Sequence, residues 1–275
     1  MIARTWSRRL TFRTSDPVVF QALRYLECDP EIAGNPAQDL TVSVEPHGAH
    51  YRIVADNKLV GDHMSVQGVI GALHAKLMNL SLAEFPAAPI VHAASLRRAG
   101  RRVLLVGPKG AGKTVLTLHL IRAGYDIEGD ENVFVADGVV PRIRALRVKE
   151  SAASVLTHLG AVFDEAPYYQ SSLGPRIYNL DPRRAGAPFW RIDRGAVDAV
   201  VLVRPNHGGC SSLRPIHSLV LVHGVIAESG FPATGRAAAV GAITKVIGNA
   251  KGYALSFGEL GGAVASIDRV VQELV

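Results

Sequence analysis

The chain has 275 residues, of which 48% are hydrophobic and 20% are charged, a balance typical of soluble globular proteins. Its formal charge of +6 suits an anionic ligand, but the arginines are scattered, so a nucleic-acid partner is not expected. The N-terminus lacks the apolar run of a signal peptide, and no stretch approaches a membrane span. Cys28 and Cys210 have no metal-ligand spacing. We expect a cytoplasmic protein with no membrane partner.

Residues 1–88 are expected to form a small α+β domain. Alternation of apolar and polar residues predicts its strands, and apolar positions at helical spacing predict its longer helix. The expected strands are 10–12, 40–44, 51–55 and 59–61, and the expected helices are 16–26 and 65–84. The prolines that follow, at 86 and 89, break the chain before the second domain.

Residues 89–275 are expected to form the second domain. A strand over 90–96 and a strand over 102–106 should pair through a tight turn, and the Asp137-Gly138 pair predicts a hairpin. The region 151–196 is expected to be largely irregular. The remaining expected elements are a helix at 115–123, a strand at 199–203, helices at 216–229 and 235–247, a strand at 253–257 and a helix at 261–274.

Residues 107–114 read Gly-Pro-Lys-Gly-Ala-Gly-Lys-Thr, which matches the phosphate-binding pattern G-x-x-x-x-G-K-[ST] between an apolar strand and a helix. Glycines let backbone N–H groups turn toward a phosphate chain, and the helix N-terminus adds further donors. Lys113 is expected on the β- and γ-phosphates, and the Thr114 hydroxyl on Mg²⁺. The expected nucleotide-binding residues are Gly107, Pro108, Lys109, Gly110, Ala111, Gly112, Lys113, Thr114 and Val115.

Two further features narrow the chemistry. Asp130-Glu131 follows the loop helix closely enough to return to the phosphates, where carboxylates hold Mg²⁺ and accept a proton; a solvated acidic turn is an equal alternative. His92 lies on the strand expected beside the loop-feeding strand, although a lone histidine there is more often a core residue. The base-reading motif of GTPases and the signature of transporter ATPases are both absent from the sequence.

The combination of 91–96, 107–114, 123–125 and 129–133 resembles the catalytic domain of HPr kinase/phosphorylase. That family belongs to the phosphoenolpyruvate-carboxykinase-like branch of P-loop proteins, and the resemblance is good over 88–150 and loose over 195–260. It implies an α/β P-loop catalytic domain with a mixed sheet, here preceded by the small α+β domain.

The resemblance also implies roles. Asp130 takes the position linked to proton transfer with the substrate hydroxyl, Glu131 that of a metal-associated acid, and His92 that of a histidine acting at the phosphate. The catalytic residues are then Asp130, His92 and Lys113, and the metal residues are Thr114, Asp130 and Glu131. Ala93 and Glu131 depart from the family's glycine and aspartate, as do Pro108 and Lys109 from its usual loop, which argues against HPr itself as the acceptor.

The expected activity is therefore an ATP- and Mg²⁺-dependent kinase that phosphorylates a hydroxyl. By resemblance to related kinases of bacterial biosynthetic clusters, the acceptor is a serine of a peptide or protein. A kinase of free serine or a sugar is one alternative, and a nucleotide-sensing module without catalysis is another; homo-oligomer formation stays open. The arginines at 97, 98, 101 and 102 are interpreted as a solvated turn, with a phosphate-binding ring as the alternative.

Overall fold

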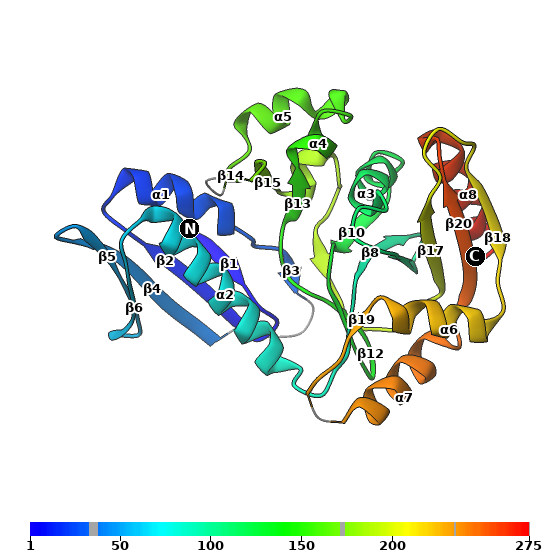
Figure 1. The fold of residues 1–275 in the computed structure, drawn as a ribbon, viewed down its shortest axis with the longest axis horizontal. Coiled ribbons are helices and arrows are strands. Elements are labelled where there is room, and N and C mark those ends of the chain that lie inside the picture. The colour runs from blue at the N-terminus through cyan, green and yellow to red at the C-terminus, as the bar shows by residue number, and fades with distance from the viewer. Residues whose placement is uncertain (33–37, 171–173, 234, 275) are drawn as a thin grey trace. The chain divides into compact units, whose positions relative to one another are not determined.

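The computed structural model describes residues 1–32, 38–170, 174–233 and 235–274, and the contacts among its elements divide the chain into two compact units (Figure 1). The first unit comprises Met1–Glu84 and Ile143–Arg184, and the second comprises Phe85–Arg142 and Ala185–Val275. Residues 143–184 thus group with the N-terminal segment, which differs from the expected division at residue 88. Both units combine helices with sheets, so the chain is of mixed α/β class. Within the described residues, no helix has the length and apolar character needed to cross a membrane.

The first unit is built on a five-stranded sheet in the order β1-β2-β4-β5-β6. β2 and β4 run parallel, and the other neighbours are antiparallel. Two helices lie together on one face of this sheet (Figure 1). The bounds are β1 (Ile2–Arg4), β2 (Arg8–Arg13), α1 (Pro17–Leu23), β4 (Gln38–His47), β5 (His50–Ala55), β6 (Lys58–His63) and α2 (Val66–Glu84).

Local chemistry explains these elements. Asp16 caps α1 by accepting hydrogen bonds from the backbone N–H groups of Val18 and Val19 at 2.8 and 3.1 Å. Val42 and Val44 alternate with partly exposed neighbours on β4 and are buried in the core below the helices. The expected helices at 16–26 and 65–84 and the expected strands of this region are confirmed, with a short 3₁₀ helix, Arg24–Leu26, completing the first helix.

Residues 143–184 add a small three-stranded sheet in the order β13-β15-β14 to this unit. The expectation of a largely irregular stretch over 151–196 is therefore only partly right, because short strands such as Tyr168–Tyr169 and Ile177–Leu180 contain too few residues to show a period. The bounds are β13 (Leu146–Lys149), α4 (Glu150–Ala153), α5 (Gly160–Glu165), β14 (Tyr168–Tyr169) and β15 (Ile177–Leu180), with 3₁₀ helices at Thr157–Leu159 and Pro182–Ala185. β3 (Glu31–Ile32) belongs to the N-terminal segment.

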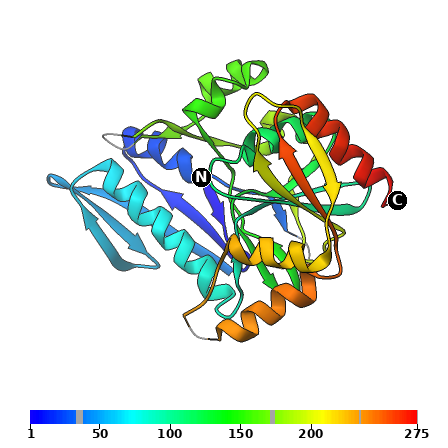
Figure 2. The ribbon, with the colours of Figure 1, turned by 45° about the vertical axis from the view of Figure 1, so that its right-hand side comes forward.

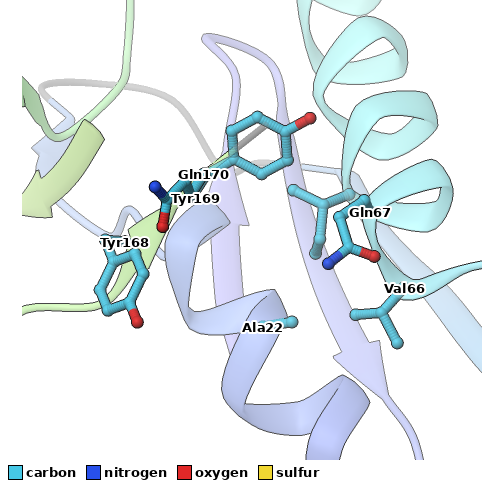
Figure 3. A pocket seen from close by; sticks show the side chains of 7 residues that line it. Ala22, Val66, Gln67, Tyr168, Tyr169 and Gln170 are labelled. Carbon is cyan, nitrogen blue, oxygen red and sulfur yellow. The ribbon is translucent and has the colours of Figure 1, made fainter. Parts of the chain in front are cut away.

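An open hollow of about 510 Å³ lies on this unit (Figure 3). Tyr168, Tyr169 and Gln170 line it from β14 and the residue after it, and Gln67 lines it from the first turn of α2. Its described lining contains aromatic and amide groups but no charged side chain.

The second unit contains a mixed six-stranded sheet in the order β10-β8-β9-β17-β20-β18. β9, β17 and β20 are parallel, β8 runs against both β9 and β10, and β18 runs against β20. α3 packs against α8, and α6 and α7 lie side by side in both views (Figures 1 and 2). The bounds are β8 (Ala93–Arg98), β9 (Arg101–Val106), α3 (Lys113–Arg122), β10 (Asp126–Gly129), β16 (Arg191–Ile192), β17 (Ala199–Pro205), β18 (Ser212–Pro215), α6 (Ser218–Ala227), α7 (Arg236–Ile247), β20 (Lys251–Phe257) and α8 (Leu260–Gln272).

A four-stranded antiparallel sheet in the order β12-β11-β7-β19 completes this unit. The expected Asp137-Gly138 hairpin is confirmed, and Gly138 supplies the positive φ of 135° at its turn. The bounds are β7 (Ile90–Val91), β11 (Val133–Ala136), β12 (Gly138–Pro141) and β19 (Ser229–Gly230).

The expected single strand over 90–96 is wrong, because the chain changes sheets at His92. β7 pairs with β11 and β19, whereas β8 pairs with β9 and β10. The backbone N–H of His92 lies between the two strands and donates to the carbonyl of Glu228 at 2.9 Å. Apolar residues on both sides of His92 gave the appearance of one continuous strand.

A buried ion pair ties β9 to β10. The Arg102 guanidinium donates to both carboxylate oxygens of Glu128 at 2.6 and 2.7 Å, and Ser95 Oγ on the intervening β8 donates to the same carboxylate at 2.6 Å. Arg102 also donates to the carbonyls of Asp193 and Ala196. The interpretation of Arg102 as part of a solvated turn is wrong, since this residue is only 3% exposed.

Replacing Glu128 with glutamine should lower the free energy of unfolding by about 3–5 kcal/mol, because it leaves a buried guanidinium without its countercharge. The matched change is Arg101→Gln, which breaks the exposed pair with Asp198 at 3.1 Å and should cost at most about 1 kcal/mol. Urea unfolding of both variants measures the difference. Equal losses would contradict a special contribution from the buried pair.

Candidate functional site

Sheet topology brings the predicted site residues to one edge of the six-stranded sheet. β9 and β10 both run antiparallel to β8, so their carboxyl ends lie at the same edge as the beginning of β8. The glycine-rich loop 107–112 leaves the end of β9, Asp130 follows β10, and His92 precedes β8. Residues distant in the chain are thus gathered by three adjacent strands.

The glycine-rich loop adopts a conformation that specific glycines permit. Gly110 and Gly112 have φ values of 89° and 84°, a region that favours glycine. A Cβ at Gly112 would also lie 2.6 Å from the ring of Phe257, and one at Gly107 would lie 2.5 Å from the carbonyl oxygen of Val203. The loop therefore needs glycine both for its backbone angles and for its close approach to β17 and β20.

Lys113 begins α3 and turns its ammonium back beneath the loop. Its Nζ donates to the carbonyls of Gly107 at 2.6 Å and Pro108 at 3.1 Å, and lies 3.5 Å from Nδ1 of His92. The residue is only 5% exposed. Burial lowers the pKa of Lys113, while the carboxylates of Asp130 and Glu228 act in the opposite direction.

Thr114 and Asp130 meet at the mouth of the loop. The Thr114 hydroxyl donates to Asp130 Oδ2 at 2.8 Å, and the backbone N–H of Glu131 donates to Asp130 Oδ1 at 2.8 Å. Asp130 is buried, whereas Glu131 is exposed and has an unusual φ of 80° for a residue other than glycine. The corner therefore holds a carboxylate and a hydroxyl together on a strained backbone.

These groups fit a hard divalent cation. Hydroxyl and carboxylate oxygens are the donors that Mg²⁺ prefers, and Mg²⁺ commonly keeps several waters and uses only one or two protein ligands. Among the described residues, no group of three or more histidine, cysteine, aspartate or glutamate side chains could hold a metal ion. The chemistry of Thr114 and Asp130 thus suits a cation shared with a phosphate ligand better than a closed protein site.

His92 faces the ammonium of Lys113 across 3.5 Å. Burial lowers the pKa of His92, and the charges of Lys113 and Lys109 lower it further, while Asp130 opposes them. A neutral imidazole at neutral pH keeps one ring nitrogen as a hydrogen-bond donor and one as an acceptor.

The structure brings His92, Lys113, Thr114 and Asp130 together as the sequence predicted, while their roles stay predictions. The other predicted nucleotide-binding residues lie in or beside the loop: Pro108, Lys109 and Gly110 are exposed, Ala111 is buried and Val115 is partly exposed. Sequence reasoning missed Glu228, which ends α6 and reaches the site through its carbonyl to His92 and through its charge on Lys113. No motif surrounds Glu228, and the pairing of β19 with β7 brings it there.

No family model and no curated protein matches the chain. Among solved structures, the Hpr(Ser) kinase/phosphatase from Coxiella burnetii matches with 12% sequence identity and a TM-score of 0.33, over 67% of this chain and 88% of that chain. So loose a superposition places the two proteins at most in a distant relationship of fold, and it carries no argument about activity. What the site does must follow from its own residues.

The imidazole of His92 should titrate below its ordinary pKa of 6.5, and Lys113→Met should raise its midpoint by removing a neighbouring positive charge. Because burial remains, the midpoint should stay below the ordinary value. Histidine ring resonances followed by NMR against pH measure both. Lys109→Met should give a smaller rise, because the charge of Lys109 lowers the pKa of His92 less than the charge of Lys113 does.

The lowered pKa of His92 also predicts how the free energy of unfolding depends on pH. Below pH 6.5 the unfolded chain takes up a proton that native His92 does not, so the free energy of unfolding should fall as the pH drops through that value. In His92→Gln this part of the decline should disappear. An unshifted titration of His92 in the wild-type chain would contradict the burial described above.

Proposed function

We propose that this chain is an ATP- and Mg²⁺-dependent kinase that transfers the γ-phosphoryl group to a hydroxyl, with a serine of a peptide or protein as the acceptor. The observation that carries the proposal is the meeting of Thr114 and Asp130 at 2.8 Å beside the loop that covers Lys113. Phosphoryl transfer asks mainly for positioning and charge stabilisation, so a short set of groups suffices.

The phosphate chain would lie along the loop 107–112, where backbone N–H groups and the first turn of α3 offer donors. Lys113 would exchange its bonds to the carbonyls of Gly107 and Pro108 for bonds to phosphate oxygens. Thr114 and Asp130 would hold Mg²⁺, with exposed Glu131 beside them. Bound Mg²⁺ supplies charge neutralisation for the phosphates.

Asp130 is the group proposed to accept the proton of the acceptor hydroxyl. The hydroxyl oxygen forms a bond to the γ-phosphorus as the bond from that phosphorus to the β–γ bridging oxygen breaks, and the proton passes to the Asp130 carboxylate. Neutral His92 would donate a hydrogen bond to a phosphoryl oxygen from beside Lys113. The strained backbone at Glu131, with φ of 80°, supports a functional role for this corner.

Asp130→Asn should lower phosphoryl transfer by roughly 10²–10⁴-fold while binding of ATP without Mg²⁺ changes little, because the amide cannot accept the proton but leaves the loop and Lys113 in place. Transfer is measured with γ-labelled ATP and Mg²⁺, offering free serine, sugars and a lysate peptide and protein pool as separate acceptors. ATP binding is measured separately by calorimetry.

The matched control is Asp137→Asn, which makes the same chemical change at a side chain that is 90% exposed in a hairpin turn. This variant should keep full transfer. If the label appeared only on a free metabolite, the acceptor would be a small molecule and not a peptide or protein. ATP binding with no label on any of the pools in the wild type would reject the kinase in favour of a nucleotide-sensing module.

A further inference from the structure

The first unit contains an apolar cavity of about 210 Å³ between α2 and the five-stranded sheet. Its walls include the buried side chains Leu10, Phe12, Val42, Ile53 and Leu73. Cavities of about 150 Å³ with such walls stay dry and take up small apolar molecules. This cavity therefore has room for a short hydrocarbon chain.

Residue choice keeps this cavity open. On α2, the small side chains of Ala72 and Ala75 face it where larger ones would close it. On β6, Gly61 pairs with Ile53 without contributing a side chain, and Val60 is the extra residue of a β-bulge. Bulges redirect a side chain locally, and here Val60 lines the cavity while remaining 49% exposed.

Polar groups accompany this apolar lining. His63, Lys76 and Asn79 line the cavity together with its apolar walls, and Lys76 and Asn79 are exposed. Within the described part of the chain, neither the ammonium of Lys76 nor the imidazole of His63 forms a hydrogen bond or ion pair. No carboxylate is among the described lining residues, so the formal charge of the lining is positive.

We propose that this cavity binds a small monocarboxylate with an apolar chain, its tail among the walls and its carboxylate at Lys76. Burial of the tail supplies the non-directional attraction. The ammonium, amide and imidazole groups of Lys76, Asn79 and His63 supply donors for a carboxylate. An amine of the same length would meet Lys76 as a like charge. This ligand site is separate from the phosphoryl-transfer proposal and does not depend on it.

The test uses the full chain and three probes of equal tail length: octanoate, 1-octanol and octylamine, each titrated by calorimetry below its aggregation limit. Octanoate should bind, octanol should bind more weakly, and octylamine should bind weakest. Lys76→Gln should weaken octanoate by about threefold to fivefold and leave octanol unchanged, because the attraction is that of an exposed ion pair. Lys58→Gln, the same change outside the lining, should leave all three affinities unchanged.

Ala72→Leu should abolish binding of both octanoate and octanol by filling the cavity. In case this variant does not fold, wild-type chain with labelled methyl groups provides the location: contacts from the octanoate tail to the methyls of Val42 and Ile53 support the proposal. Octanoate contacts elsewhere, no octanoate binding, or equal octanoate affinity in wild type and Lys76→Gln would each overturn it.

Discussion

The buried pair of Arg102 and Glu128 is the constraint on which the site geometry depends. It joins β9 to β10 across β8, and Ser95 of β8 donates to the same carboxylate. Glu128 is also the extra residue of a bulge, because Ile127 pairs with Leu96 and Gly129 pairs with Ser95. A charged residue in the interior is costly unless it is fully paired. The pair therefore favours the register in which the bulge brings Asp130 to the mouth of the loop.

The change of sheet at His92 has a similar consequence. If 90–96 formed one strand, the backbone N–H of residue 92 would bond within a regular β-ladder. It would then not be available to the carbonyl of Glu228. Instead β7 turns to pair with β19, and the carbonyl of Glu228 receives the N–H of His92. The site thus lies where two sheets separate, a place where side chains can face a ligand without giving up core contacts.

Much of this arrangement could be predicted from the sequence, because the relevant signals are local. Adjacent residues carry the pattern that predicts each of four features: the glycine-rich loop, the helix after it, the Asp137-Gly138 hairpin and α2. Other features depend on partners far away in the chain and leave no local pattern. The burial of Arg102 depends on Glu128, the break at His92 depends on Glu228, and the place of residues 143–184 depends on contacts with the N-terminal segment.

The lysine that follows the glycine-rich loop holds this loop in shape through its own hydrogen bonds. Lys113 bonds to the carbonyls of Gly107 and Pro108, and Asp130 and Glu228 favour its charge although burial disfavours it. A phosphate chain would bring more negative charge than either carboxylate, so it would compete for the ammonium without having to order the loop. The loop loses its conformational entropy when the chain folds, and the glycines at 107, 110 and 112 allow the loop to adopt this conformation. In the proposed kinase, binding would exchange hydrogen bonds from the ammonium to neutral carbonyls for hydrogen bonds to anionic phosphate oxygens, which is how a preorganised anion site would gain affinity.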